Sequence, residues 1–317
     1  HHLGMRVMLD FVFRTAARDH VYLREHPDWF YWIKADRADS LAAPRVKGLG
    51  HAVVSPENVG LLYASEDMPR FIDSFVPPPD PEAWRALCRR ADEKGENCLE
   101  LAMREWGICT LPGFADTIND PQPPWTDVTY LKFYFDSSPA AKALPEFGRL
   151  PPFIAQDGVK CSVFPGREPN RALWDRIAGV IPDYIRRYHI DGARIDMGHA
   201  LPTPLGRELV RAAKAADPDF LLWSEEFDPQ KAQAAKEEGY HFILGDVWSA
   251  WKGVSPSRLG ESLAGCAAAA LPMVAATELS DSPRAPLMAG SQEKADAAFL
   301  LAALLPNTYL LINNGQE

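Results

Sequence analysis

The second half of the chain alternates short apolar runs with longer amphipathic stretches. The apolar runs are typical of buried parallel strands and lie at residues 192–195, 220–223, 242–244, 273–276 and 308–312. The amphipathic stretches predict helices at residues 171–188, 204–216, 229–238, 256–270 and 291–304. Strands that alternate with helices indicate a parallel sheet in an α/β fold.

The first half of the chain has a different pattern. One apolar strand at residues 5–12 is followed by a long stretch, residues 14–165, that shows little periodicity and is rich in proline and tryptophan. Only residues 81–88 and 96–106 predict short helices within it. Loops of this length in a compact protein are usually functional.

Together these elements predict six strands, two fewer than a closed (β/α)₈ TIM barrel. The sequence has neither a GxGxxG nor a GxxxxGK[ST] motif, which weakens a doubly wound nucleotide-binding fold. We therefore expect a truncated barrel of strands 3 to 8 with a long insertion after strand 3. Residues 1–13 would hold strand 3, residues 14–165 the insertion with its substrate loops, and residues 166–317 strands 4 to 8 with the catalytic residues. A chain that starts and stops at strands is expected to be a fragment.

Composition narrows the possible partners. The net charge of -10 would repel nucleic acid and anionic membranes but is compatible with a neutral ligand such as a sugar. No apolar run reaches the ~18 residues of a membrane span. The five cysteines form no CxxC pair, which favours reduced thiols and a cytoplasmic location, with the periplasm as the alternative.

Acidic residues follow the predicted strands in the second half. They are Asp196, Glu225, Glu226, Glu278 and Asp281. In a barrel of this kind the carboxyl ends of the strands form the active site. Asp196 and Glu225 would face each other from neighbouring strands, as a retaining glycosidase requires of its two carboxylates. A lone acidic residue at a strand end is more often a helix cap, but Arg194 lies on the same strand face as Asp196 and would keep it ionised.

These residues belong to an ordered set of motifs that resembles glycoside hydrolase family 13. The segments carrying the resemblance are Met-Leu-Asp-Phe-Val at 8–12, Asp-Gly-Ala-Arg-Ile-Asp at 191–196, Trp-Ser-Glu-Glu at 223–226, Thr-Glu-Leu-Ser-Asp-Ser-Pro-Arg at 277–284 and Asn-Asn-Gly-Gln-Glu at 313–317. The resemblance implies Asp196 as nucleophile, Glu225 as general acid/base with a raised pKa, and Asp281 as the stabiliser of the transition state. The substrate contacts expected around them are Asp10, Arg14, Trp125, Arg194, His199, Glu226, Glu278 and Arg284. For Trp125 and His199 a role in the core is the open alternative.

Two departures from the family pattern indicate a branch within it. Arg14-Thr15 replaces the family's Asn-His, and Ser280 replaces the histidine before Asp281. A guanidinium at position 14 cannot ligate calcium, which argues against a structural calcium ion; no metal or other cofactor is expected. These differences, with the insertion segments at 13–19, 26–32, 112–116, 118–125 and 197–202, resemble the bacterial maltosyltransferase branch. The resemblance implies transfer of maltosyl units between α-1,4-glucans or maltooligosaccharides.

Two alternatives remain at this stage. An α-amylase or α-glucosidase uses the same covalent step but transfers the glycosyl group to water. A catalytically inactive barrel would only bind glucan, although such proteins commonly lose a catalytic acid and all three are present here. The oligomeric state is left open by the sequence.

Overall fold

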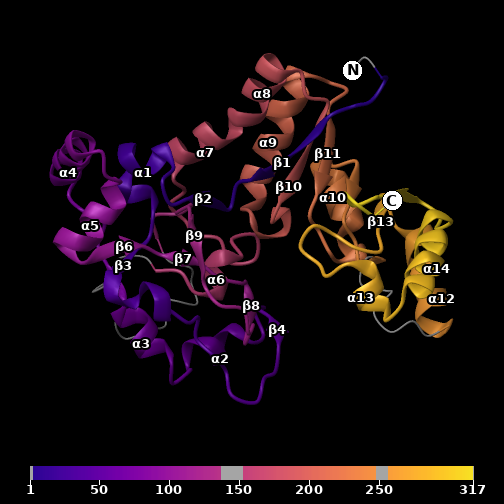
Figure 1. Ribbon diagram of the computed structural model, residues 1–317, viewed down its shortest axis with the longest axis horizontal. Coiled ribbons are helices and arrows are strands. Elements are labelled where there is room, and N and C mark those ends of the chain that lie inside the picture. Colours follow the sequence, from indigo (N-terminus) through magenta and orange to yellow (C-terminus); the bar gives the residue numbers. More distant parts are fainter. Residues whose placement is uncertain (1–2, 137–152, 248–255, 317) are drawn as a thin grey trace. The chain divides into compact units, whose positions relative to one another are not determined.

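The computed structural model describes residues 3–136, 153–247 and 256–316 (Figure 1). The chain divides into two compact units. The parallel-sheet unit comprises His1–Phe11, Gly179–His199 and Gly206–Glu317, and the antiparallel unit comprises Val12–Ala178 and Ala200–Leu205. The last residue of the expected motif at 313–317 lies outside the described residues.

The parallel-sheet unit is built on a six-stranded sheet. Its strands are β1 (Met8–Val12), β10 (Gly192–Asp196), β11 (Leu221–Ser224), β12 (Phe242–Ile243), β13 (Met273–Ala275) and β14 (Thr308–Leu310). They lie in the sheet in the same order as in the sequence, and the pairs from β10 to β14 are parallel. A doubly wound sheet would reverse its strand order at a switch point. The six predicted strands are thus confirmed, and their order is that of successive β/α units.

Helices connect these strands, and all of them were predicted from the sequence except the short one at Ala285–Ala289. They are α8 (Val180–Tyr188), α9 (Thr203–Ala216), α10 (Ala232–Glu238) after a 3₁₀ turn at Pro229–Lys231, α12 (Pro256–Ala268), α13 (Ala285–Ala289) and α14 (Gln292–Ala303). Ser291 caps α14 by accepting a hydrogen bond from Lys294 N. Leu244, Val274 and Ala276 are buried at the sheet and form part of its apolar core.

One predicted helix is two helices in the structure. The amphipathic stretch 171–188 divides into α7 (Arg171–Ala178) and α8, with Gly179 between them. Pro182 in the first turn of α8 has no N–H to donate to the Ala178 carbonyl, so the helical hydrogen-bond ladder is interrupted there. The two units also divide between Ala178 and Gly179.

The antiparallel unit is more structured than the sequence predicted. It has three small sheets, with strand orders β2-β9-β7, β5-β3-β6 and β4-β8. The strands are β2 (Thr15–Ala17), β3 (Trp32–Lys34), β4 (Ala52–Val53), β5 (Phe75–Val76), β6 (Ile108–Thr110), β7 (Pro112–Gly113), β8 (Thr117–Ile118) and β9 (Trp125–Tyr130). Most span two or three residues, which is too short for a periodic signal.

The described helices of this unit are α1 (Val21–Glu25), α2 (Val59–Tyr63), α3 (Met68–Asp73), α4 (Pro81–Lys94), α5 (Cys98–Trp106), α6 (Gln156–Val159) and α7, with 3₁₀ turns at Pro27–Trp29 and Ala35–Ser40. Helix α4 is six residues longer than the predicted 81–88, because no stop signal occurs before Gly95, which adopts φ 65°. The buried rings of Trp32 and Trp84 meet edge to face at 5.3 Å. Among the described residues of both units, no helix has the length and apolarity needed to cross a bilayer.

Candidate active site

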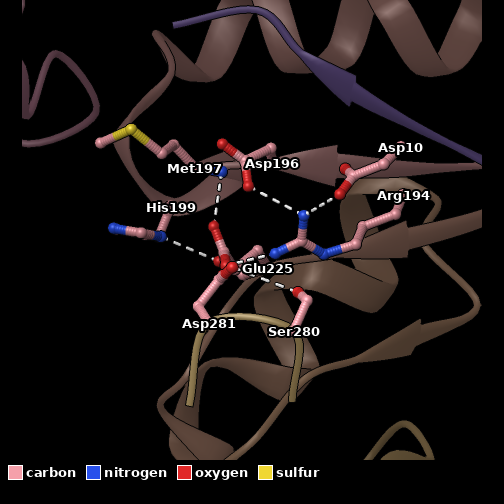
Figure 2. Close-up of polar contacts among 8 residues, drawn as sticks. All are labelled: Asp10, Arg194, Asp196, Met197, His199, Glu225, Ser280 and Asp281. Atoms are coloured by element: carbon pink, nitrogen blue, oxygen red, sulfur yellow. Dashed lines mark hydrogen bonds and ion pairs between the residues drawn. The ribbon is translucent and has the colours of Figure 1, made fainter. Parts of the chain in front are cut away.

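The centre of the candidate site is the guanidinium of Arg194 on β10 (Figure 2). Its Nη1 lies 2.5 Å from Asp10 Oδ2 and 2.8 Å from Asp196 Oδ1, and its Nη2 donates to Glu225 Oε1. These carboxylates come from β1, from the end of β10 and from the residue after β11. One cation therefore joins three acidic residues from three adjacent strands.

Strand register explains this convergence. Arg194 and Asp196 lie two residues apart on β10, so both side chains project from the same face. In the parallel ladder Arg194 pairs with Trp223 of β11, and its guanidinium lies over the Trp223 ring at 5.5 Å from the centroid. The side chain of Arg194 is only 13% exposed, so its charge is poorly screened by water.

Glu225 is the most perturbed carboxyl group of the site. Burial, followed by the negative charge of Asp196, raises the pKa of Glu225 to about 7, against the opposing effects of Arg194 and of the Met197 N–H. Met197 N donates to Glu225 Oε2 at 2.7 Å, and Met197 adopts a positive φ of 49° that aims its N–H. A carboxyl group with this pKa is protonated at or below neutral pH, which agrees with the direction expected from the sequence.

Asp196 and Asp10 lie on either side of Arg194. Asp196 is largely buried, with 22% of its side chain exposed, and is held by the ion pair to Arg194. Asp10 is more open, with 53% of its side chain exposed. Its pKa is raised, first by burial and then by the Asp196 charge, while Arg194 acts in the opposite direction.

Asp281 lies on the loop after β13, and its negative charge contributes to the raised pKa of Asp10. The side chain of Asp281 is exposed, and its Oδ1 accepts a hydrogen bond from Ser280 Oγ at 3.2 Å (Figure 2). It is therefore within electrostatic range of the same site and open to a ligand.

Glu278 anchors that loop. It is 1% exposed, and its carboxylate accepts from Ala285 N at 2.5 Å and from Asn313 Nδ2 at 3.1 Å and pairs with Arg284 Nη1 at 2.8 Å. Arg284 also donates to the Asn314 carbonyl at 3.0 Å. These contacts tie the Asp281 loop to the segment after β14. In the structure the polar atoms of Glu278 and Arg284 position the loop, and the substrate contacts expected for them stay predictions.

Glu226 also has a structural environment. Its Oε1 accepts from Asp228 N at 3.0 Å and its Oε2 lies 3.4 Å from Lys231 Nζ. In the structure Glu226 supports the turn after β11, and its expected substrate contact stays a prediction. His199 is closer to the reacting groups, since its Nδ1 lies 2.8 Å from the Glu225 backbone oxygen and its ring meets Phe227 edge to face.

The two remaining expected contacts, Arg14 and Trp125, belong to the antiparallel unit. Arg14 is fully buried and donates to the carbonyls of Val159 at 2.8 Å, Leu131 at 2.9 Å and Gly158 at 2.7 Å. With its guanidinium against the rings of Tyr130 and Phe133, a role in the core accounts for Arg14 in place of the expected substrate contact. Trp125 packs over Gly113, where an added Cβ would lie 2.9 Å from its ring.

Sequence reasoning missed two participants in the site. The Met197 N–H is a backbone group and leaves no side-chain signal. Trp223 entered the sequence analysis only as part of the motif at 223–226, yet its ring faces Arg194; pairing residue 194 with residue 223 across the parallel ladder would have revealed this. Within the described residues, no group of three or more His, Cys, Asp or Glu side chains is arranged to hold a metal ion.

Comparison with known proteins identifies structural neighbours only. No protein-family model matches the sequence, and no curated protein matches it. Similar solved structures include an α-amylase from Lactobacillus plantarum (16% identity, TM-score 0.49) and an α-amylase from Geobacillus thermoleovorans complexed with acarbose (14%, 0.49). A noncanonic maltogenic α-amylase from Thermotoga neapolitana is also similar (14%, 0.47).

In each of these three comparisons the whole of this chain is covered, together with 52%, 51% and 48% of the respective amylase. The chain thus spans about half the length of the solved amylases that it resembles.

Proposed function

We propose that the protein is a retaining enzyme of the α-amylase type that moves maltosyl units between α-1,4-glucans. The observation that carries the proposal is the Arg194 guanidinium held between Asp196 and Glu225. Two carboxylates bound to adjacent nitrogens of one guanidinium are close enough to act on a single anomeric carbon, as the ~5–5.5 Å separation of a retaining pair requires. Their different environments assign them different roles.

In the proposed first step, Asp196 attacks the anomeric carbon of the donor. The glycosidic bond breaks, and the protonated Glu225 gives its proton to the departing oxygen, which leaves a covalent maltosyl ester on Asp196. In the second step Glu225, now ionised, removes the proton from an incoming sugar hydroxyl. The acceptor oxygen then replaces Asp196 on the anomeric carbon, and both side chains return to their starting states.

The other acidic residues would support the charge that develops on the sugar. Asp281, exposed on the loop after β13, would stabilise the oxocarbenium-like transition state, and Asp10 would bind a sugar hydroxyl beside Arg194. His199 would orient Glu225 through its backbone oxygen. In this proposal the six-stranded sheet forms strands 3 to 8 of a (β/α)₈ barrel and residues 14–165 are its insertion.

The transfer of maltosyl units rests on the sequence resemblance to the maltosyltransferase branch, including Arg14 and Ser280 at the two departure positions. Hydrolysis is the competing outcome, because water can intercept the same covalent ester. The proposal depends on the acceptor sugar reaching the ester first.

Chromatography of the products formed from pure maltotetraose tests this. Products of two and six glucose units, with no free glucose and no new reducing ends, are the expected result. A rise in reducing ends would assign the protein to the hydrolases. Unchanged substrate, with a protein shown to be folded by circular dichroism, would overturn the catalytic proposal in favour of glucan binding alone.

A further inference from the structure

A small cavity lies in the antiparallel unit, beside helix α3. Its volume is about 90 Å³. Its polar wall consists of Arg37, Ser40, Asp67, Arg70 and Ser74. Sites for drug-sized molecules begin at ~300 Å³, so this cavity suits a small ionic group rather than a whole sugar.

Arg37 stands in this wall without a partner for its charge. It belongs to the 3₁₀ turn at Ala35–Ser40 and is half-buried. Its Nε is buried and has no hydrogen-bond acceptor among the described residues. The carboxylate of Asp73, at the end of α3, is instead paired with Lys34 Nζ at 3.0 Å. A buried donor without an acceptor costs free energy, and an anionic ligand would remove that cost.

Arg70 on α3 supplies a second positive charge. Its backbone carbonyl accepts a hydrogen bond from Ser74 Oγ at 3.2 Å, which holds a hydroxyl group at the same wall. Two guanidinium groups against one carboxylate leave the wall positively charged, although the whole chain has a net charge of -10. The local charge therefore favours an anion, and the planar N–H groups of arginine match the oxygens of a phosphate.

The carboxylate of Asp67 distinguishes between anions. Its Oδ2 accepts a hydrogen bond from Arg45 N at 3.1 Å, which fixes the side chain in place. A carboxylate can only accept hydrogen bonds, so a ligand beside it has to offer a donor. Hydrogen phosphate carries a P–O–H group, whereas sulfate has no proton near neutral pH. A carboxylate beside two guanidinium groups thus fits a protonated phosphate and disfavours sulfate.

We propose that this cavity binds a phosphate group, either as free hydrogen phosphate or as the monoanion of a phosphate monoester. Arg37 and Arg70 donate hydrogen bonds to its oxygens, and its P–O–H group donates to Asp67. The site is independent of the proposed sugar chemistry, because its wall residues belong to the antiparallel unit and none is a residue of the candidate active site.

Titration calorimetry of the full chain with sodium phosphate tests the proposal. At about pH 6 and constant ionic strength, both phosphate and its monoesters carry a proton. The expected result is saturable binding at one site, with sodium sulfate bound about tenfold or more weakly. A parallel titration with glycerol phosphate separates the two sources. Tighter binding than that of inorganic phosphate supports the site with a monoester as its ligand, and weaker binding supports it with free phosphate.

Variants assign the contacts. Arg37→Gln should weaken phosphate binding about tenfold or more, because it removes charge-assisted hydrogen bonds. Asp67→Asn should reduce the preference for phosphate over sulfate, since an amide can donate to sulfate. Arg89→Gln, at an exposed position of α4 outside the cavity, is the matched control and should bind phosphate as the unmodified chain does.

Three results would each overturn the proposal. They are an unmodified chain that binds neither phosphate nor glycerol phosphate, sulfate bound as tightly as phosphate, and a folded Arg37→Gln variant with unchanged affinity. The titrations of the unmodified chain decide the matter even where a variant fails to fold.

Discussion

Arg194 faces more negative charge than it can neutralise. One guanidinium contacts Asp10, Asp196 and Glu225, so full ionisation of the three carboxyl groups would leave excess negative charge in a poorly hydrated site. The free energy of the site is lowest when the most buried carboxyl group, that of Glu225, keeps its proton. In the proposed mechanism this protonated Glu225 would be the general acid.

Removal of that acid is the first prediction. Glu225→Gln should lower kcat on maltotetraose by about 10²–10⁴-fold, because an amide cannot donate a proton to the leaving oxygen. Glu226→Gln is the matched control: Glu226 is equally buried, with 8% exposed, but its carboxylate contacts Asp228 N and Lys231. Steady-state kinetics should show at most a severalfold effect for the control. Equal losses in the two variants would remove the acid role from Glu225.

The raised pKa of Glu225 predicts how the rate of the reaction depends on pH. Glu225 acts as an acid only while protonated, and its pKa of about 7 means that the proton is lost as the pH rises through neutrality. The rate kcat/KM should therefore fall about tenfold per pH unit above roughly pH 7. A pH–rate profile in buffers of constant ionic strength measures this limb. A rate that stays level up to pH 9 would contradict the assignment.

Substitution of Arg194 should shift the descending limb of the pH–rate profile. The Arg194 charge opposes the rise in the Glu225 pKa, so Arg194→Gln should shift the descending limb to higher pH while lowering kcat. A purely structural role would lower activity without moving the limb. The comparison is valid for a variant whose near-ultraviolet circular dichroism matches that of the unmodified chain.

The charged residues of the candidate site could be identified from the sequence, but the contacts between them could not. Asp196, Glu225 and Arg194 were found from strand ends and alternation. The contact between Arg194 and Glu225 depends on the register between β10 and β11, which no local pattern contains. For the same reason the loop contacts of Glu226, Glu278 and Arg284 were not predicted from the sequence.

Within the parallel sheet, the approach of β10 to β11 depends on a glycine. A Cβ at Gly192 would lie 2.9 Å from the Leu221 carbonyl oxygen and 2.6 Å from the Met8 Cε. The methionine can move, but the backbone oxygen cannot move without separating the strands.

Gly192→Ala should therefore destabilise the protein by ~1–3 kcal/mol and reduce activity, because β10 carries Arg194 and Asp196. Gly260→Ala provides the control: Gly260 lies in helix α12 with open space around its Cβ position, and alanine there should be neutral or stabilising by up to ~1 kcal/mol. Urea denaturation of both variants measures the difference. Equal stabilities would show that β10 has room to move.

Two kinds of element boundary were missed: one within a continuous apolar pattern, and those of strands too short to have a periodic signal. The helix at 171–188 was predicted as one because its apolar spacing continues through Gly179, whereas Pro182 breaks its hydrogen bonds. The small sheets of the antiparallel unit pair strands distant in sequence, such as β2 with β9. Their pairing is set by tertiary packing rather than by local propensity.

At the scale of the whole molecule, the stability of the antiparallel unit is expected to depend on Arg14. Arg14, the residue before β2, donates to the carbonyl of Leu131 after β9 and to two carbonyls of α6, so Arg14→Ala should leave those acceptors buried without a donor. We expect a loss of ~3 kcal/mol or more in the free energy of unfolding. Arg89→Ala, at an exposed position of α4, should change it by less than ~0.5 kcal/mol. Equal urea midpoints for the two variants would contradict the structural role of Arg14.

The order of the strands was the most predictable global feature. Alternating strands and helices in the second half imply parallel neighbours, and the sheet follows the sequence order. The antiparallel unit was predicted only as a long insertion, because its stability comes from buried aromatic contacts and from Arg14, which reaches partners more than a hundred residues away.

The central claim is that Asp196 forms a covalent bond to the sugar. Incubation with a fluorinated maltosyl fluoride, which forms the glycosyl ester faster than the ester is released, followed by peptic digestion and mass spectrometry, tests it most directly. The account predicts a fluoromaltosyl adduct on the peptide that contains Asp196, and no adduct in Asp196→Asn. An adduct on another carboxylate, or turnover of maltotetraose by folded Asp196→Asn at the unmodified rate, would contradict it.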